Sequence, residues 1–191
     1  RNIVATRSGF EVIDVLQTIA GLKEVTKVIQ EIVKTNGLML LVGTSPAVKQ
    51  LVKETATRLE LPYVVQRWLG GTLTNFKVIR KRIEYMERLE KEKAAGEFEK
   101  YTKKERMKKE EEIASMRKIY DGLRALTKLP EAVFVVDMTH DTTAVRETKK
   151  IKLPLVALTD TNSPAHLAEY PIPANDDALP AVRYMIGRIG T

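Results

Sequence analysis

Residues 38–42 read LMLLV, and no unbroken apolar run in the chain is longer. A strand that is apolar at every position has both faces covered, as in the centre of a parallel sheet. The turn Gly43-Thr44-Ser45 follows directly, and Thr44 or Ser45 can cap a helix whose first position suits Pro46. This stretch therefore predicts a strand that passes straight into a helix.

The same alternation continues on both sides of this unit. Further strands are predicted at 61–65, 132–137 and 155–158, with a short extended piece at 170–173. Helices are predicted from Asp14, as cap, to residue 34, where Asn36-Gly37 ends the pattern, then at 142–150 and 178–189. Apolar strands that alternate with helices predict a three-layer α/β domain built on a parallel sheet.

Residues 77–128 break this alternation and carry a different period. Apolar residues recur at steps of three and four in two runs, as in an a/d seam: Ile79, Ile83, Met86 and Leu89, then Ile113, Met116, Tyr120, Leu123 and Thr127. Thr102 with Glu105 forms a capping box for the second run. The pattern predicts an antiparallel, coiled-coil-like helical hairpin, so we divide the chain into an α/β domain (1–76 and 129–191) and an inserted hairpin (77–128).

Positive charge is concentrated in the same segment. The 191 residues carry 32 Lys and Arg against 25 Asp and Glu, a formal net charge of +7. Residues 77–128 hold 17 basic and 11 acidic side chains, compared with 9 and 6 in 1–76 and 6 and 8 in 129–191. Such a cluster favours binding to a polyanion, of which nucleic acid is the commonest, although a solvated Lys/Glu face has a similar pattern.

Composition excludes several classes of protein. No apolar stretch approaches the roughly 20 residues of a membrane-spanning helix, so no membrane partner is expected. The chain has no Cys, which excludes disulfides, a thiolate nucleophile and a zinc ribbon. It begins with Arg1 rather than Met, so we expect it to derive from a longer chain.

The best place for enzyme chemistry is the carboxyl edge of the sheet. Amides of the Gly43-Thr44-Ser45 turn could hold a phosphate, but the turn lacks the glycines and Lys of known nucleotide motifs, so an ordinary capped turn is favoured. Asp137 and Asp160 could hold Mg²⁺ together with Asp141, which is equally well placed as a helix cap. We expect no catalytic residue and no cofactor.

The most unusual stretch is RWLGGTLTNF, residues 67–76. In a structural interpretation, Gly70-Gly71 lets the backbone turn while Trp68 closes the base of the hairpin, whose first helix is capped by Thr74 or Asn75. In a functional interpretation, Arg67 and the Gly-Gly amides face phosphates and Trp68 stacks on a base. The residues alone leave both open.

These residues resemble a known family, the bacterial-type small-subunit ribosomal protein two (uS-two) family. Three further stretches resemble its motifs in order: 130–137 followed by Asp141, Val145, Glu147 and 152–154; VALTDTN at 156–162; and YPIPANDDA at 170–178. The resemblance implies a flavodoxin-like sheet of five parallel strands with the inserted hairpin. It departs from the family at Ser45-Pro46, where members often carry a Lys pair, and at Ala174, which replaces a Gly.

The resemblance also implies a non-catalytic function. Members bind small-subunit ribosomal RNA, contact neighbouring ribosomal proteins and help to recruit ribosomal protein S-one in bacteria. We therefore expect a structural constituent of the small ribosomal subunit, located in the cytoplasm, with an organellar ribosome left open. The alternative is an α/β enzyme that binds a nucleotide or sugar phosphate at the Gly43-Thr44-Ser45 turn.

Charge clustering and loop position select the RNA-binding candidates. They are Arg67 and Trp68 at the hairpin base, Lys77, Arg80, Lys81 and Arg82 on the first helix, Lys103, Lys104, Arg106, Lys108 and Lys109 on the second, and, as weaker choices, Arg1, Arg7 and Lys49.

Overall fold

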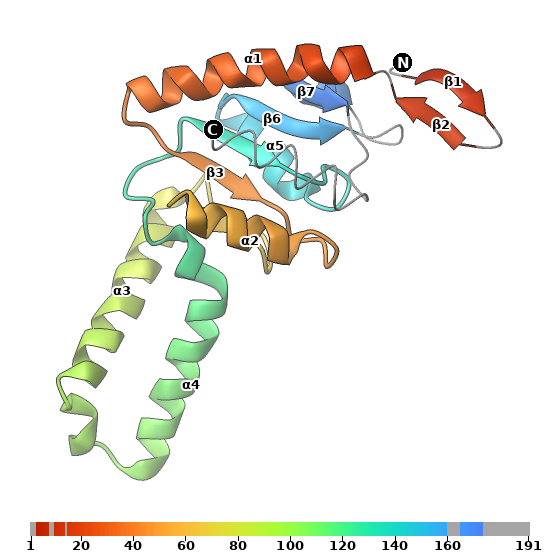
Figure 1. Cartoon of the computed structure of the whole chain (residues 1–191). Helices are drawn as coiled ribbons and strands as arrows, with labels where there is room; N and C mark the ends of the chain where they lie inside the picture. The colour runs from red at the N-terminus through yellow and green to blue at the C-terminus, as the bar shows by residue number, and fades with distance from the viewer. Residues whose placement is uncertain (1–2, 8–9, 14, 160–164, 174–191) are drawn as a thin grey trace.

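A computed structural model describes residues 3–7, 10–13, 15–159 and 165–173 (Figure 1). Its centre is a sheet of five parallel strands in the order β4-β3-β5-β6-β7. The strands are β3 (Met39–Val42), β4 (Tyr63–Val64), β5 (Ala132–Val135), β6 (Leu155–Thr159) and β7 (Tyr170–Pro173). In chain order this is 2-1-3-4-5, the flavodoxin-like order, so the predicted α/β fold with a five-stranded parallel sheet is confirmed.

Helices cover both faces of the sheet, which gives three layers. On one face, α1 (Val15–Lys34) and α2 (Lys49–Arg58) pack against side chains such as Leu41 and Phe134. On the other, α5 (Thr142–Lys150) and the start of α3 (Phe76–Ala94) pack against alternate residues such as Leu40 and Val133. Because successive side chains of a strand point to opposite faces, an unbroken apolar run supplies both layers.

The helical arm consists of α3, the short 3₁₀ helix η1 (Glu97–Lys100) and α4 (Lys103–Tyr120). Figure 1 shows α3 and α4 side by side, extending away from the sheet. The α3 positions Ile79, Ile83, Met86 and Leu89 are all buried, as their spacing predicts. A second 3₁₀ helix, η2 (Asp121–Leu123), returns the chain toward β4.

Several helix ends test the predicted caps. The Thr102–Glu105 capping box is present: the Glu105 amide donates to Thr102 Oγ1 (3.4 Å) and the Thr102 amide to Glu105 Oε2 (3.0 Å). At the end of α1, Asn36 has a φ of +49° and the Gly37 amide donates to the Ile32 carbonyl (2.8 Å), which confirms the predicted stop. The proposed cap Asp14 lies outside the described residues.

Other expectations about helix ends are wrong. The helix after β3 begins at Lys49, three residues beyond Pro46, and neither Thr44 nor Ser45 caps it. No side chain caps α3: Asn75, at the cap position, makes no capping hydrogen bond, and the Thr74 hydroxyl donates to Glu147. Thr127 lies beyond the end of α4 and is exposed, so it is not part of the seam. For Thr44 and Thr74 the cause is the same: each hydroxyl is bonded to a distant carboxylate, of Asp141 or Glu147, and is not available as a cap.

The sequence pattern did not predict one element at the start of the chain. The strands β1 (Ile3–Arg7) and β2 (Phe10–Ile13) pair in antiparallel register. The apolar residues at 10, 12 and 13 indicated only a short patch, because so short a run lacks a clear period. The predicted final helix at 178–189 lies outside the described residues.

Candidate nucleic-acid interface

The loop at the base of the arm is organised by one buried carboxylate, that of Glu147 in α5. Its Oε1 accepts hydrogen bonds from the Trp68 indole (3.2 Å) and the Gly71 amide (2.6 Å). Its Oε2 accepts from the Leu73 amide (3.0 Å), the Thr74 amide (3.1 Å) and the Thr74 hydroxyl (3.2 Å). Five donors from a single loop therefore converge on a residue about 75 positions later in the chain.

This arrangement holds Glu147 in its charged form. Burial by itself raises the pKa of a carboxyl group, but hydrogen bonds from the amides of Gly71, Thr74 and Leu73 and from the Trp68 indole outweigh it. The pKa of Glu147 therefore lies below its usual value of 4.5. The loop is an anion-binding site, as the glycine pair indicated, but the anion is the protein's own.

Two parts of the functional interpretation of this loop need correction. Trp68 is only 8% exposed and packs in the core beneath the sheet, so its ring offers no free face to a nucleic-acid base. The Gly71 amide already donates to Glu147 and is not free for a phosphate. The position of Trp68 fits the structural interpretation, in which this side chain closes the base of the arm. Arg67 is exposed beside it.

On α3, the predicted basic residues divide into free and engaged side chains. Lys77, Lys81 and Arg82 are exposed and make no ion pair with another described residue. Arg80 is partly buried: its Nε lies 3.2 Å from Glu84 Oε1 and its Nη1 donates to the carbonyl of Arg124 (3.3 Å). Arg80 therefore contributes to holding the base of the arm together.

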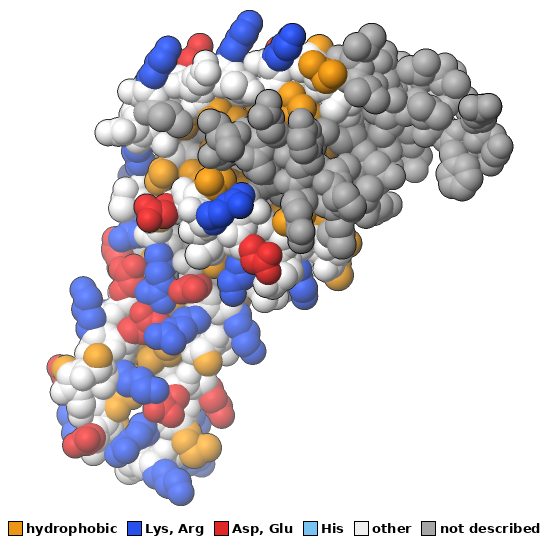
Figure 2. Space-filling model, in the orientation of Figure 1, with side chains coloured by type: hydrophobic (Ala, Val, Ile, Leu, Met, Phe, Trp, Pro, Cys, Tyr) orange, Lys and Arg blue, Asp and Glu red, His pale blue; other side chains and the backbone are white. Residues whose placement is uncertain are grey.

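On α4, the same division applies. Lys103, Lys104 and Lys108 are exposed and make no ion pair with another described residue. Lys109 lies over two aromatic rings near the end of the arm, 4.7 Å from the Tyr101 centroid and 5.5 Å from that of Phe98. Arg106 is partly buried, and its Nε has no hydrogen-bond partner among the described residues. Figure 2 shows Lys and Arg side chains along the visible face of the arm, with acidic side chains among them.

The two helices of the arm are joined by an ion-pair network around Glu90. Arg124 donates from Nη1 and Nη2 to the two oxygens of Glu90, each at 2.8 Å, and Arg117 donates to Oε1. The hydrogen bond from Arg124 is the main cause that lowers the pKa of Glu90, from 4.5 to about 2, with Arg117 adding to it against the effect of burial. Glu90 is therefore ionised throughout the physiological range and ties α3 to the end of α4.

The weaker candidates lie away from the arm. Lys49 is exposed at the first residue of α2, and Arg7 is the last residue of β1. Arg1 lies outside the described residues. The structure thus does not place Lys49 or Arg7 with the basic residues of α3 and α4.

The alternative enzyme site at the carboxyl edge of the sheet is closed by an internal contact. Thr44 donates from its amide to Asp141 Oδ2 (3.1 Å) and from its hydroxyl to Asp141 Oδ1 (2.6 Å). Burial raises the pKa of Asp141 even though these bonds from Thr44 favour its charged form. Asp160 lies outside the described residues. Among the residues that the structure describes, no group of three or more Asp, Glu, His or Cys side chains is placed to hold a metal ion.

Glu147 is the residue that sequence reasoning missed. The sequence indicates Glu147 only as one residue of a family motif. One signal of its role is its position in α5, where it lies on the buried side with Ala144, Val145 and Thr148. An acidic residue on a buried helix face requires donors close by, and a Gly-Gly loop with consecutive free amides is a natural source. The pattern could not show which loop supplies them.

Comparison with known proteins gives a consistent family. The family model described as ribosomal protein S2 matches residues 1–191. Curated relatives named small ribosomal subunit protein uS2 include those of Roseiflexus castenholzii (43% identical over 98% of this chain and 71% of the relative) and Thermus thermophilus (40%, 98% and 73%). The relative from Chloroflexus aurantiacus is 39% identical, with coverages of 98% and 79%.

The fold of the structure is consistent with membership of this family. Within the described ranges, no helix is both long enough and apolar enough to cross a membrane. The five-stranded parallel sheet flanked by helices fits the fold that the family resemblance implies. The match extends over the whole chain, and the chain belongs to the ribosomal protein S2 family.

Proposed function

We propose that this chain binds small-subunit ribosomal RNA, chiefly through the basic side chains of the α3–α4 arm. Its family is a structural, non-enzymatic one whose members are named small ribosomal subunit proteins. The observation that carries the proposal is a set of six exposed cations on the arm without an ion pair to any described residue: Lys77, Lys81, Arg82, Lys103, Lys104 and Lys108.

Physical chemistry favours phosphate groups as the partners of these cations. An exposed Lys or Arg that makes no internal ion pair can neutralise a phosphate without first breaking a bond within the protein. The available contacts are side-chain charges on helix surfaces, and Trp68 is buried and not exposed for stacking. Binding would therefore depend on backbone phosphates and on shape more than on base sequence.

The wider assembly follows from the same proposal. The protein would function in the ribosome, in contact with rRNA and neighbouring ribosomal proteins, with the inserted residues 77–128 as the main RNA-binding element. Recruitment of ribosomal protein S-one is a further part of the proposal and is supported by the family resemblance alone. The alternative enzyme function has no comparable support, because Asp141 occupies the donors of the Thr44 turn.

A salt titration tests RNA binding. If the six cations each neutralise about one phosphate, the logarithm of the association constant for small-subunit rRNA should fall with the logarithm of salt concentration with a slope of roughly −4 to −5. Filter binding between 50 and 300 mM KCl would measure it. In parallel, the native protein should sediment with small subunits in a cell lysate. A slope near zero, or protein found only at the top of the gradient, would refute the proposal.

A further inference from the structure

Charge along the arm is separated into three levels. Residues 77–82 hold four basic side chains and no acidic one, Lys77, Arg80, Lys81 and Arg82, which we call the base patch. Residues 95–109, at the far end, hold three acidic and six basic side chains, and the basic ones form the tip patch: Lys100, Lys103, Lys104, Arg106, Lys108 and Lys109. Between them, residues 83–94 and 110–118 hold seven acidic and five basic side chains, and we call this level the acidic band.

A contact between α3 and α4 shows that the two segments of the acidic band lie at the same level of the arm. Lys93 Nζ lies 2.9 Å from Glu110 Oε1, so the two halves of the acidic band face one another. Counting 1.5 Å per residue along α3 to Lys93 and along α4 from Glu110, Lys81 and Lys104 lie roughly 27 Å apart along the arm, and the facing members Arg82 and Lys109 roughly 18 Å apart. Even the shorter distance is about twice the Debye length of about 8 Å at physiological salt, so the field of one patch is largely screened at the other.

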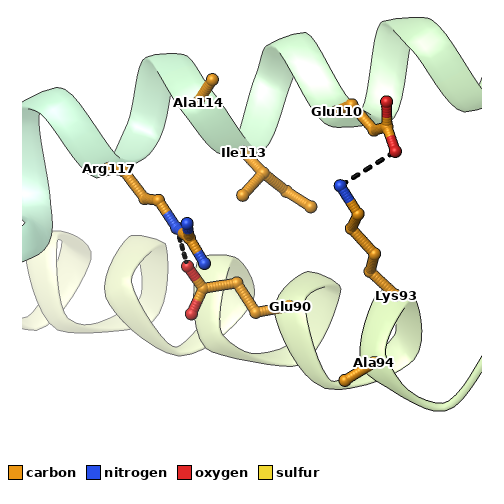
Figure 3. Close-up of a pocket in the computed structure, with 7 residues that line it drawn as sticks. All are labelled: Glu90, Lys93, Ala94, Glu110, Ile113, Ala114 and Arg117. Atoms are coloured by element: carbon orange, nitrogen blue, oxygen red, sulfur yellow. Dashed lines mark hydrogen bonds and ion pairs between the residues drawn. The ribbon is translucent and has the colours of Figure 1, made fainter.

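The cations of the acidic band are mostly paired with its acids. Arg117 donates to Glu90, Lys93 pairs with Glu110, and Arg88 lies 3.8 Å from Glu92. Figure 3 shows the first two pairs on either side of Ile113, where a groove of about 450 Å³ runs between the helices. Both cations that line this groove are engaged, so it offers no free positive charge to a phosphate. Each patch, by contrast, has three exposed cations without an ion pair to a described residue.

We infer that the arm binds RNA at two separate points, the base patch and the tip patch, with the acidic band held away from phosphate. The inference rests on the proposed function and deepens it, because it says which parts of the arm touch RNA. A continuous strip of contacts would place phosphates against Glu84, Glu111 and Glu112, which are exposed and negative. Two phosphate groups about the length of the arm apart fit the charge distribution better.

Two-point contact has a measurable consequence for affinity. When two weak contacts are held on one rigid element, the second binds at a high effective concentration, and removing either one loses this gain. We expect Lys77→Gln, Lys81→Gln and Arg82→Gln together to weaken rRNA binding about tenfold or more and to reduce the salt slope by about two to three. Lys103→Gln, Lys104→Gln and Lys108→Gln together should do the same.

The matched control removes the same charge from the acidic band. Arg88→Gln, Lys91→Gln and Lys118→Gln change three exposed basic residues on the same two helices. We expect this variant to leave affinity within about twofold and the salt slope unchanged. Circular dichroism would confirm that all three variants keep their helices. Equal losses for the three variants would show that only total charge matters, and would overturn the inference.

A second measurement locates the contacts directly. The chain has no Cys, so a single Cys carries a unique short photo-crosslinker. Val78→Cys lies beside the base patch and Met107→Cys beside the tip patch, where Val78 and Met107 are 48% and 53% exposed, while Ser115→Cys lies on the outer side of the acidic band. In assembled small subunits, positions 78 and 107 should crosslink to RNA at two distinct places, and position 115 should not.

The outcomes separate the inference from the proposed function. Failure of the wild-type protein to enter subunits would refute the proposed function itself. Entry into subunits with RNA crosslinks at all three positions would show a continuous contact, and crosslinks from position 107 to protein would make the tip a protein contact. Either of the last two results overturns the two-point inference and leaves rRNA binding in place.

Discussion

Replacing Glu147 by Gln or Ala is expected to lower the free energy of unfolding by about 3–5 kcal/mol. Its carboxylate accepts hydrogen bonds from five donors of the loop before α3, three of them backbone amides. Ala would leave these donors without a partner in a buried site. Gln would keep one acceptor oxygen but would turn its NH₂ group toward N–H donors, so it should not rescue the contact.

The measurement is urea unfolding followed by circular dichroism, with a parallel thermal scan. For a chain of this length, a loss of 3–5 kcal/mol corresponds to a decrease in Tm of roughly 6–20 °C. Glu111→Gln is the matched control, because Glu111 is exposed on α4 and has no ion pair with a described residue. It should change stability by less than about 0.5 kcal/mol. A Glu147→Gln variant as stable as this control would contradict the role assigned to the carboxylate.

The same carboxylate gives a prediction for pH. The pKa of Glu147 is lower in the folded protein than its ordinary value of 4.5. The charged group therefore stabilises the fold at pH values above 4.5, and this stability is lost as the pH falls through the pKa of the folded state. The difference in unfolding free energy between wild type and Glu147→Gln should be constant above about pH 6 and should shrink below pH 4.5. Urea titrations at pH 3.5, 4.5, 6 and 7 would measure it, and a difference that grows on acidification would show the reverse sign.

The sheet could be predicted from the sequence because its signal is local. Residues 38–42 and 132–136 are apolar at every position, and the structure places both strands between two helical layers that bury alternate side chains. The α3 seam was equally readable, since burial repeats every three or four residues along one helix. In each case the physical cause leaves a local mark: removal of both faces of a strand from water gives an unbroken apolar run, and removal of one helix face gives a period of three to four residues.

The base of the arm could not be predicted because its bonds connect distant parts of the chain. Trp68 and Glu147 are 79 residues apart, and Thr44 and Asp141 are 97 apart. Each side chain has several plausible local partners, so Thr44 and Thr74 were assigned to caps that they do not form. A polar residue in a sequence shows that a partner is needed, and only the folded chain shows which one it has.

Gly122→Ala is expected to lower the free energy of unfolding by about 2–3 kcal/mol, because no side chain fits where η2 meets the edge of the sheet. A Cβ at Gly122 would lie 2.3 Å from the Tyr63 carbonyl oxygen and 2.6 Å from its ring carbon Cδ2. The nearest atom belongs to the backbone of β4, which cannot rotate away as a flexible side chain could. The segment that returns from the arm would have to move off the sheet.

Gly70→Ala is the control that isolates this steric effect. A Cβ at Gly70 meets no atom within 4 Å, so the change should be neutral or slightly stabilising. Urea unfolding would compare the two variants, and equal stabilities would contradict the close contact. Because Gly122 joins the end of the arm to β4 while Glu147 holds its beginning to α5, the two sites fix both ends of the arm against the sheet and its helices. Gly122→Ala should therefore also weaken binding to small-subunit rRNA at temperatures where the variant is still folded, which filter binding would detect.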